Sequence, residues 1–452
     1  MLGIDTKTNP KGGTFQVSIS ARTNQNSCLI NEQFDLDNIT PFAGANIIVD
    51  YMRQLGIDQK LEELSVKKAP WADFSSSSEM QIIMTAYMLG LERIDHTRTM
   101  EFDKFLAQKF GLAKLPSTSN LYRTLERFDS AEKVSELNSV NQLPIRQLVT
   151  DDKQAIVDID STVNTVHGRQ EGTTVGYNPR YHGRASYQPL LAFEGNSKAC
   201  IYAELRSGKT PDSDENIKVY RNAKANLPEG VKLGFVRADR AFPSNEFLTS
   251  LEEDQVGYTI KLKLSKNVKR RLEHGVLWER IYYDDSFVIE VGSVKLQLHN
   301  WDEPRKVVFI RQTEYADTRQ LRLFNLWDYQ AIVTNLGWCP EDIWRFYNQR
   351  CTCENFIKEL KYGLNIDSIS KASFQANAAD LWLKVICYNI LLVMKSHAPD
   401  EYKNCSISKL QRILFTVPAL IVRHARRLTL RLPSWWPYKV VWQAMRRALK
   451  PC

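Results

Sequence analysis

The 452-residue sequence lacks long apolar runs, paired metal-ligand cysteines and, towards its end, acidic residues. Nowhere do roughly 18 apolar residues follow one another, so we expect no membrane-spanning helix and no membrane partner. The stretch from Met1 to Asn26 is polar and has no apolar segment of the kind that secretory signals carry. We therefore expect a cytoplasmic protein.

The eight cysteines are scattered and form no CxxC pair. Cys351 and Cys353 are the one close pair, and two thiols cannot supply the four tetrahedral ligands of a structural zinc ion. We expect most of the cysteines to be reduced thiols buried in apolar surroundings. Because 452 residues are too many for one ordinary core, we also expect two or three domains.

The net charge of +8 is unevenly distributed, because no acidic residue lies between Lys409 and Cys452. That stretch contains the following cations: Lys409, Arg412, Arg423, Arg426, Arg427, Arg431, Lys439, Arg446, Arg447 and Lys450. The interleaved aromatic residues are Trp435, Trp436, Tyr438 and Trp442. This composition favours a nucleic acid as partner. The alternative is a pair of amphipathic helices whose basic face is merely solvated.

The first part of the chain is predicted to be helical. Residues 1–35 are irregular, and from about Asp37 to Arg146 apolar residues recur at helical spacing. The small polar residues of Pro116–Asn120 can cap a helix over Leu121–Phe128, whose start carries Tyr122, Arg123 and Arg127. Such a helix is typical of a helix-turn-helix recognition element, although an ordinary packed helix has the same pattern.

An α/β pattern begins at Asp151. It predicts, in order, strands over Ala155–Asp160, Tyr187–Phe193 and Ala199–Leu205, a helix from Asp212 to Asn226, a strand over Lys232–Ala238 and a helix over Ser244–Glu253. This order is the one expected of a ribonuclease-H-like fold. Strand-like residues then continue from Tyr258 to about Phe324 and indicate a β-rich insertion, after which Tyr329–Thr334 is predicted to be the fifth core strand.

Helices are predicted for the remainder, beginning with Pro340–Leu364 and Ser373–His397. The predicted fold class is therefore α/β, with a ribonuclease-H-like mixed sheet flanked by helices, a β-rich insertion and helical N- and C-terminal regions. The predicted domains are a helical DNA-end-binding domain over 1–150, the two parts of the core over 151–264 and 326–400, the β-rich insertion over 265–325, and a basic helical region for DNA or dimer contacts over 401–452.

Two aspartates close predicted strands of this core. Asp160 ends the first strand and Asp239 follows the fourth, so both reach one edge of the sheet if those strands are neighbours. Asp158 points to the same face as Asp160 but lies deeper in the strand, so we prefer Asp160. Taken singly, either aspartate is more simply a turn former or a helix cap.

The helix after the fifth strand carries four chemically active side chains on one stripe. Tyr347, Arg350, Glu354 and Lys361 fall within about 60° of one another at 100° per residue. Glu359 lies well away from this stripe. An ion-pair ladder at the surface would explain why Arg350 and Glu354 share this stripe. It would not explain the presence of Tyr347 or Lys361 there.

Three carboxylates on such a frame suit phosphodiester chemistry. Cleavage with two divalent ions needs three or four carboxylate ligands that hold the ions roughly 3.5–4 Å apart. Oxygen ligands select Mg²⁺ or Mn²⁺ over zinc. Arg350 and Lys361 would then contact DNA phosphates, and Tyr347 would donate to another.

The sequence resembles a known family at these positions. Tyr347, Arg350, Glu354 and Lys361 match, in residue and spacing, the YREK signature of DDE transposases from bacterial insertion sequences. Further segments that look like this group are Asp158–Thr162, Gly176–Pro179, Arg237–Arg240 and Glu359–Leu364. The resemblance covers roughly Asp151–His397.

The resemblance implies a DNA transposase that moves an insertion sequence by cleaving and transferring strands at terminal inverted repeats. It implies two Mg²⁺ or Mn²⁺ ions held by Asp160, Asp239 and Glu354, double-stranded DNA as partner, a synaptic homodimer and a bacterial, nucleoid-associated location. Beyond the YREK residues, the predicted DNA contacts are Arg240, Arg184 and Trp301. Some relatives stack a flipped base on an insertion tryptophan, and both Trp278 and Trp301 lie in the insertion here. One loop carries Arg180, His182 and Arg184. It either contacts DNA phosphates or is simply exposed to solvent.

Two other classes of function compete with this interpretation. A transposase-derived protein that binds specific DNA without catalysis would keep the basic C-terminal region but would not need the carboxylates. A glycosidase would use two carboxylates. It would need neither Arg350 and Lys361 beside Glu354 nor a C-terminal stretch free of acidic residues.

Overall fold

The computed structural model describes residues 32–150, 154–209, 212–273, 275–283, 287–314, 327–369, 371–425 and 427–449. The chain divides into Met1–Asn38 and Ile39–Cys452, and every helix and strand below belongs to the second unit. The irregular structure that we predict for 1–35 falls largely outside the described residues.

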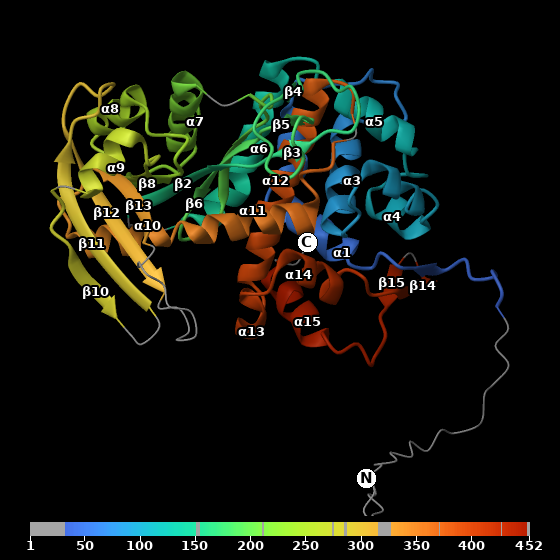
Figure 1. Cartoon of the computed structure of the whole chain (residues 1–452). Helices are drawn as coiled ribbons and strands as arrows, with labels where there is room; N and C mark the ends of the chain where they lie inside the picture. The colour runs from blue at the N-terminus through green and yellow to red at the C-terminus, as the bar shows by residue number, and fades with distance from the viewer. Residues whose placement is uncertain are drawn as a thin grey trace, which may run out of the picture. The chain divides into compact units, whose positions relative to one another are not determined.

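Helices make up most of the first third and the last third of the described chain (Figure 1). The helices are α1 (Ala45–Gln54), α2 (Ile57–Glu63), α3 (Ser76–Met88), the 3₁₀ helix η1 (Ile94–Thr99), α4 (Lys104–Lys109), α5 (Thr118–Glu126), α6 (Ala131–Leu148), α7 (Ser213–Ala225), α8 (Asn245–Glu253), α9 (Lys266–Glu273), α10 (Pro340–Asn348), α11 (Cys351–Leu364), α12 (Phe374–Ser396), α13 (Asp400–Lys403), α14 (Ile407–Leu414) and α15 (Lys439–Ala448). The helix predicted after Pro116–Asn120 is confirmed as α5.

The strands form one large sheet and two small ones. They are β1 (Ile39–Thr40), β2 (Ala155–Ser161), β3 (Asn164–Thr165), β4 (Thr174–Val175), β5 (Ala185–Tyr187), β6 (Leu190–Glu194), β7 (Cys200–Glu204), β8 (Leu233–Ala238), β9 (Gly257–Lys261), β10 (Glu279–Tyr283), β11 (Phe287–Leu296), β12 (Arg305–Glu314), β13 (Asp328–Thr334), β14 (Ala419–His424) and β15 (Arg427–Arg431). The large sheet has nine strands in the order β10-β11-β12-β13-β9-β8-β2-β6-β7.

Within this sheet, β2, β8 and β9 run parallel and the other neighbours are antiparallel. The predicted mixed sheet flanked by helices is therefore confirmed. The prediction that Tyr329–Thr334 is the fifth core strand is wrong, because β9 takes the place beside β8 and β13 pairs with the far side of β9. The strands of the expected insertion continue the same sheet beyond β13.

Alternation along the strands sends side chains to two cores on opposite faces of the sheet. Val157, Ile159 and Val236 pack with α7 and α8 on one face. Leu191 and Phe193 pack with α11 and α12 on the other, where α10 covers β11–β13. Figure 1 shows α7 and α8 on one side of the strands and α10 and α11 on the other. The face that carries α10–α12 is also the face to which Asp158 and Asp160 belong.

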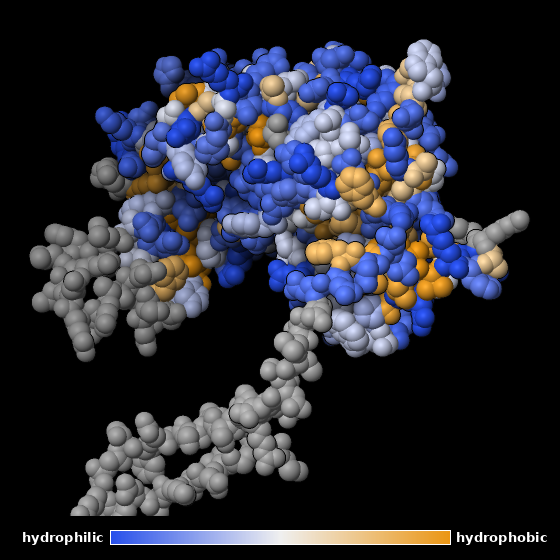
Figure 2. Space-filling model, turned by 90° about the vertical axis from the view of Figure 1, so that its right-hand side faces the viewer, coloured by the Kyte–Doolittle hydropathy of each residue, from blue (hydrophilic) through white to orange (hydrophobic). Residues whose placement is uncertain are grey.

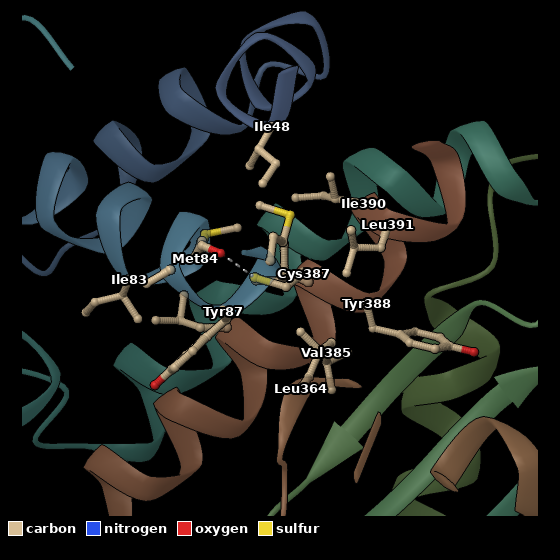
Figure 3. Close-up of a cluster of buried hydrophobic side chains, with 14 of the residues drawn as sticks. Ile48, Ile83, Met84, Tyr87, Leu364, Val385, Cys387, Tyr388, Ile390 and Leu391 are labelled. Carbon is tan, nitrogen blue, oxygen red and sulfur yellow. Dashed lines mark hydrogen bonds between the residues drawn. The ribbon is translucent and has the colours of Figure 1, made fainter. Parts of the chain in front are cut away.

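Helix α12 is the centre of the helical core. Among the described residues it is the one helix long and apolar enough to cross a membrane by length and composition, and that stretch is wholly buried within the protein. Figure 3 shows its Cys387 pointing to Met84 of α3 and its Ile390 lying toward Ile48 of α1, whereas Val385 lies beside Leu364 of α11. The outer face in Figure 2 is mainly hydrophilic, with apolar side chains in small groups. Four of the six described cysteines are buried, as expected for packed thiols.

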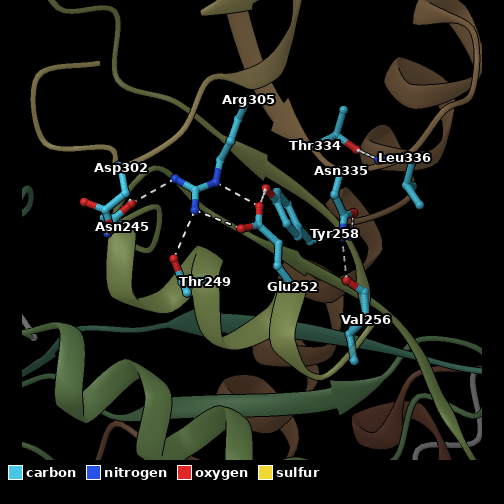
Figure 4. Close-up of polar contacts among 10 residues, drawn as sticks. All are labelled: Asn245, Thr249, Glu252, Val256, Tyr258, Asp302, Arg305, Thr334, Asn335 and Leu336. Carbon is cyan, nitrogen blue, oxygen red and sulfur yellow. Dashed lines mark hydrogen bonds and ion pairs between the residues drawn. The ribbon is translucent and has the colours of Figure 1, made fainter. Parts of the chain in front are cut away.

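The outer strands are fastened to α8 by one buried arginine. Arg305 of β12 donates from Nε and Nη2 to the two carboxylate oxygens of Glu252, both at 2.8 Å. It also donates to Asn245 at 3.0 Å and to Thr249 at 3.1 Å. Tyr258 of β9 donates to the same glutamate at 2.6 Å. Figure 4 shows how these side chains tie β12, β9 and α8 together.

The C-terminal region is only partly helical, so this prediction needs correction. β14 and β15 pair as antiparallel strands, and β14 also pairs with β1. Polar and apolar residues alternate along β15, which satisfies the two-residue period of a strand. Two cations of this basic region contact the helical region, since Arg446 pairs with Asp50 and Arg423 donates to Gln108 at 2.9 Å.

Candidate active site

The carboxyl ends of the three parallel strands bring three charged residues into one row. Ile159 of β2 is paired with Ala238 of β8, and Ala238 is paired with Ile260 of β9. The next residues along the strands are Asp160, Asp239 and Lys261. Paired positions in neighbouring parallel strands share a face, so the two aspartates and the lysine lie side by side at one edge.

Helices α10 and α11 complete a cavity of about 700 Å³ above this row. Besides the row itself, its lining includes all four residues of the predicted stripe: Tyr347, Arg350, Glu354 and Lys361. The structure therefore gathers the predicted catalytic residues and the predicted YREK residues in one place, although Asp160 and Glu354 are far apart in the sequence.

The helix that we predict over Pro340–Leu364 is interrupted at Gln349 and Arg350. At this turn the backbone makes bonds to the third residue back, from Arg350 N to Tyr347 O at 2.9 Å and from Cys353 N to Arg350 O at 2.8 Å. Such a tightened turn within a helix often marks a functional position. It keeps Tyr347 on α10 and the remaining stripe residues on α11 around the same cavity.

Asp160 sits in a strongly charged and largely buried environment. Its Oδ1 lies 2.9 Å from Nη2 of Arg350 and accepts a hydrogen bond from Ser161 N at 2.9 Å. The pKa of Asp160 is raised to about 6, because burial, together with the smaller effects of the Asp239 and Glu354 charges, outweighs the opposing effect of Arg350. Asp160 is therefore close enough to both Asp239 and Glu354 to be repelled by their charges.

The carboxylate side chains at this site are chemically suited to bind divalent cations. Carboxylate oxygens are the ligands that Mg²⁺ and Mn²⁺ prefer, and a bound cation would relieve the repulsion around Asp160. Across the described part of the chain, no three Asp, Glu, His or Cys side chains already stand close enough to hold one metal ion.

Asp158 has a different role from Asp160, because both of its oxygens are taken by one arginine. Arg237 donates from Nε and Nη2 to Asp158 at 2.6 and 2.7 Å, and both side chains are almost fully buried. The same guanidinium donates from Nη1 to Phe346 O at 3.0 Å and to Gln349 Oε1 at 3.3 Å. The pair therefore fixes the α10–α11 turn relative to β2 and β8.

The cations and the tyrosine of the stripe are not freely exposed. Arg350 is 6% exposed and faces Asp160, and Tyr347 is 5% exposed. Lys361 is half-buried, and its Nζ donates to Val163 O at 3.4 Å. Burial lowers the pKa of Lys361, with Arg180 adding to this effect and Asp367 opposing it.

The remaining predicted DNA contacts lie in different settings. Arg240 is exposed beside Asp239, and Arg184 is exposed on the loop between β4 and β5. Trp301 is only 3% exposed and packs in the core below Arg305, away from the cavity. Trp278 is half-buried, with the guanidinium of Arg311 4.4 Å from its ring centre. Neither tryptophan lines the cavity beside the carboxylates.

Sequence reasoning did not identify three charged residues at this site, namely Lys261, Lys358 and Arg237. Lys261 and Lys358 line the cavity, and Arg237 anchors the turn from behind. Lys261 is the last residue of β9, and Asp239 directly follows β8. The position of Lys261 at a strand end was therefore the signal for this residue. For Lys358 the signal was its spacing of one helical turn from Glu354.

The fold and the site agree with a comparison of the whole chain. A model of the family described as "Transposase DDE domain group 1" matches residues 23–452. The chain belongs to this family of DDE transposases.

Two further comparisons add little. No curated protein matches the sequence. Among solved structures, the chain is similar to a "piggyBac transposase synaptic complex with hairpin DNA" studied by cryo-EM, at 11% identity and a TM-score of 0.43. That match covers 90% of this chain and 82% of the other, and similarity of this degree establishes neither a shared fold nor a shared function.

Proposed function

We propose that this protein is an active DNA transposase that binds terminal inverted repeats, cleaves DNA strands there and transfers them to a target, so that an insertion sequence moves. The observation that carries the proposal is the convergence of Asp160, Asp239 and Glu354 in one cavity with Arg350 and Lys361. Family membership supports it. We take β7-β6-β2-β8-β9 to be a ribonuclease-H-like core.

In this proposal Asp160, Asp239 and Glu354 would hold two Mg²⁺ or Mn²⁺ ions. When bound, such ions activate a water or a 3′-hydroxyl and stabilise the leaving oxygen. Arg350 holds the carboxylate of Asp160 in place and offsets part of its charge. Lys361 and Lys261, which both line the cavity, attract the phosphates of the DNA end, and the Tyr347 hydroxyl donates to a further phosphate oxygen.

The surrounding regions receive proposed roles as well. We assign residues 1–150 to DNA-end binding and 401–452 to contacts with DNA or with a second subunit. Arg184, exposed on the β4–β5 loop, and Arg240, exposed next to Asp239, are proposed to contact the DNA backbone. We further propose that the protein forms a homodimer in the synaptic complex and acts on nucleoid DNA in the bacterial cytoplasm.

The test is a cleavage assay on a labelled duplex that carries the inverted repeats flanking the gene. With Mg²⁺ or Mn²⁺ we expect the wild-type protein to cut the 3′ end of the element. Glu354→Gln should bind the same duplex with similar affinity and fail to cut it, because one carboxylate ligand is lost.

A matched control lies on the same helix. Glu359 is outside the cavity and sits 3.9 Å from Lys395, so Glu359→Gln should cut like the wild type. Specific binding of the repeats without cleavage under either metal would instead identify a DNA-binding protein derived from a transposase. Equal loss of cleavage in both variants would show that Glu354 has no special role.

A further inference from the structure

A second cavity, of about 870 Å³, adjoins the carboxylate cavity. Asp160, Asp239, Lys361 and Arg180 line both cavities, so the two are continuous at the reacting edge of the sheet. A cavity of this size accepts groups of small-molecule size. A nucleotide meets this condition, whereas a DNA duplex does not.

Exposed aromatic rings form part of the wall of this second cavity. Tyr177 is 60% exposed and Tyr181 is 52% exposed, and both lie on the loop between β4 and β5. The ring of His167 meets Tyr181 edge-on at 6.2 Å between centroids. Aromatic rings left open to solvent beside a polar cavity suit a partner that stacks, since every nucleobase has a flat π-face.

The loop is held in a defined shape by one buried side chain. Asn178 is 3% exposed, and its Oδ1 accepts hydrogen bonds from Arg180 N at 3.2 Å and Tyr181 N at 3.0 Å. Its Nδ2 donates to Thr165 Oγ1 at 2.9 Å. The two tyrosines are therefore presented on a pre-formed turn, which lowers the entropy lost on binding.

Two cations, Arg180 and Lys361, stand at the boundary between the two cavities, beside the carboxylates of Asp160, Asp239 and Asp367. Arg180 is exposed there and acts on Lys361 closely enough to lower its pKa in addition to the effect of burial. Two cations that repel each other across a shared wall gain from an anion placed between them. A phosphate of a strand that passes from one cavity to the other would supply that anion.

We propose that the second cavity binds unpaired nucleotides of the DNA strand that enters the carboxylate cavity, with Tyr177 and Tyr181 stacking on bases and Arg180 and Lys361 contacting the phosphate between them. This inference rests on the proposed function, because it takes DNA to be the substrate of the adjoining site. It assigns base stacking to the β4–β5 loop, in place of the buried Trp301.

The experiment measures DNA binding by the full-length protein in the presence of a chelator, so that no cleavage occurs. Fluorescence anisotropy compares a short labelled oligothymidine with a blunt duplex of the same length. The double variant Tyr177→Ala/Tyr181→Ala should bind the single strand roughly tenfold more weakly or worse, since each stacked base contributes about 1–3 kcal/mol. Its affinity for the duplex should stay within about twofold of wild type, because the stacking surface does not contact paired bases.

Two further variants serve as controls. Tyr177→Phe/Tyr181→Phe keeps both rings and should bind the single strand like the wild type. Trp71→Ala removes an 86% exposed aromatic ring that lines neither cavity and should change nothing. Equal loss for both DNA forms, or unchanged single-strand binding by the double alanine variant, would overturn the proposal.

The outcome is separable from that of the cleavage assay. Selective loss of single-strand binding in a protein that never cuts the repeats would support this site while refuting the proposed transposase activity. A protein that cuts the repeats but whose double alanine variant binds single strands normally would refute this site alone.

Discussion

Asp158 and Asp160 share a strand and a face, yet their partners give them opposite roles. Asp158 forms a two-pronged buried pair with Arg237 and supports the α10–α11 turn from behind. Asp160 opens onto the cavity and meets Arg350, Asp239 and Glu354. The difference arises from depth in the strand, because a position two residues further along reaches the edge where the loops leave the sheet.

Asp158→Ala should therefore behave as a stability variant. It leaves the buried Arg237 without its counter-ion, so we expect the free energy of unfolding to fall by about 3–5 kcal/mol in urea denaturation. Glu354→Ala, at an exposed position, should change it by less than about 0.5 kcal/mol while abolishing cleavage. An Asp158→Ala protein as stable as the wild type would contradict the positioning role of this pair.

Lys261→Ala should act through DNA phosphates. We expect weaker binding for all duplex sequences and a slope of affinity against salt that is smaller by about 1, since one phosphate contact is removed. Lys263→Ala, which removes an exposed lysine outside the cavity, provides the comparison. Identical salt slopes for the wild type and Lys261→Ala would show that Lys261 contacts no phosphate.

At this scale the sequence predicted the carboxylates better than their neighbours. Asp160, Asp239 and Glu354 could be named because strand ends and helical spacing are visible in the order of residues. Arg237 and Lys261 depend on the register between β2, β8 and β9, which is decided by pairing between distant segments. The buried state of Trp301 depends equally on distant packing against α8 and the outer strands.

At the scale of elements, the outer strands are an extension of the sheet that one arginine attaches to α8. Arg305 makes four hydrogen bonds to that helix through its guanidinium. A lysine cannot reproduce this two-pronged geometry. The β10–β12 strands are thus joined to the core by β13 on one side and by this contact on the other.

Arg305→Lys should lower the free energy of unfolding by roughly 2–4 kcal/mol, because Glu252 keeps only a weaker single contact. Chemical denaturation measures the change, and limited proteolysis should show faster cutting within β10–β12. Arg345→Lys is the matched control, because its pair with Glu341 is exposed and should matter by less than about 0.5 kcal/mol. The prediction fails if the two variants are equally stable.

Two of the mispredicted elements were missed for different reasons. The break between α10 and α11 accompanies the contacts of Gln349 with Arg237 and of Arg350 with Asp160, which the local sequence does not reveal. In the C-terminal region we gave weight to charge and overlooked the alternation of Leu428 and Leu430 with polar residues, which indicates a strand.

At the scale of the whole molecule, a buried charge cluster joins the helical core to the segment between α11 and α12. Asp380 of α12 lies 3.1 Å from both Lys371 and Lys384 and accepts a hydrogen bond from Tyr87 of α3. Although burial alone would raise its pKa, the two lysines outweigh burial and lower the pKa of Asp380 to about 2.

This shift fixes the direction of a pH effect. The folded pKa lies below the ordinary value of 3.8, so the stabilisation is complete above about pH 4 and is lost as the pH falls towards 2. Asp380→Asn, which leaves two buried cations unpaired, should cost about 3–5 kcal/mol at neutral pH. The gap between the urea midpoints of the wild type and the variant should narrow below about pH 4. A constant gap would contradict the cluster's ionised state.

The order of the site residues along the chain has a consequence for protein synthesis. Asp160 and Asp239 leave the ribosome early, whereas α11, which carries Glu354, is made only after all nine strands of the sheet. A nascent or prematurely terminated chain that ends before α11 has two of the three carboxylates and lacks both Glu354 and Lys361. Under the proposed function, such fragments could not cut DNA, because the third carboxylate is added only with α11.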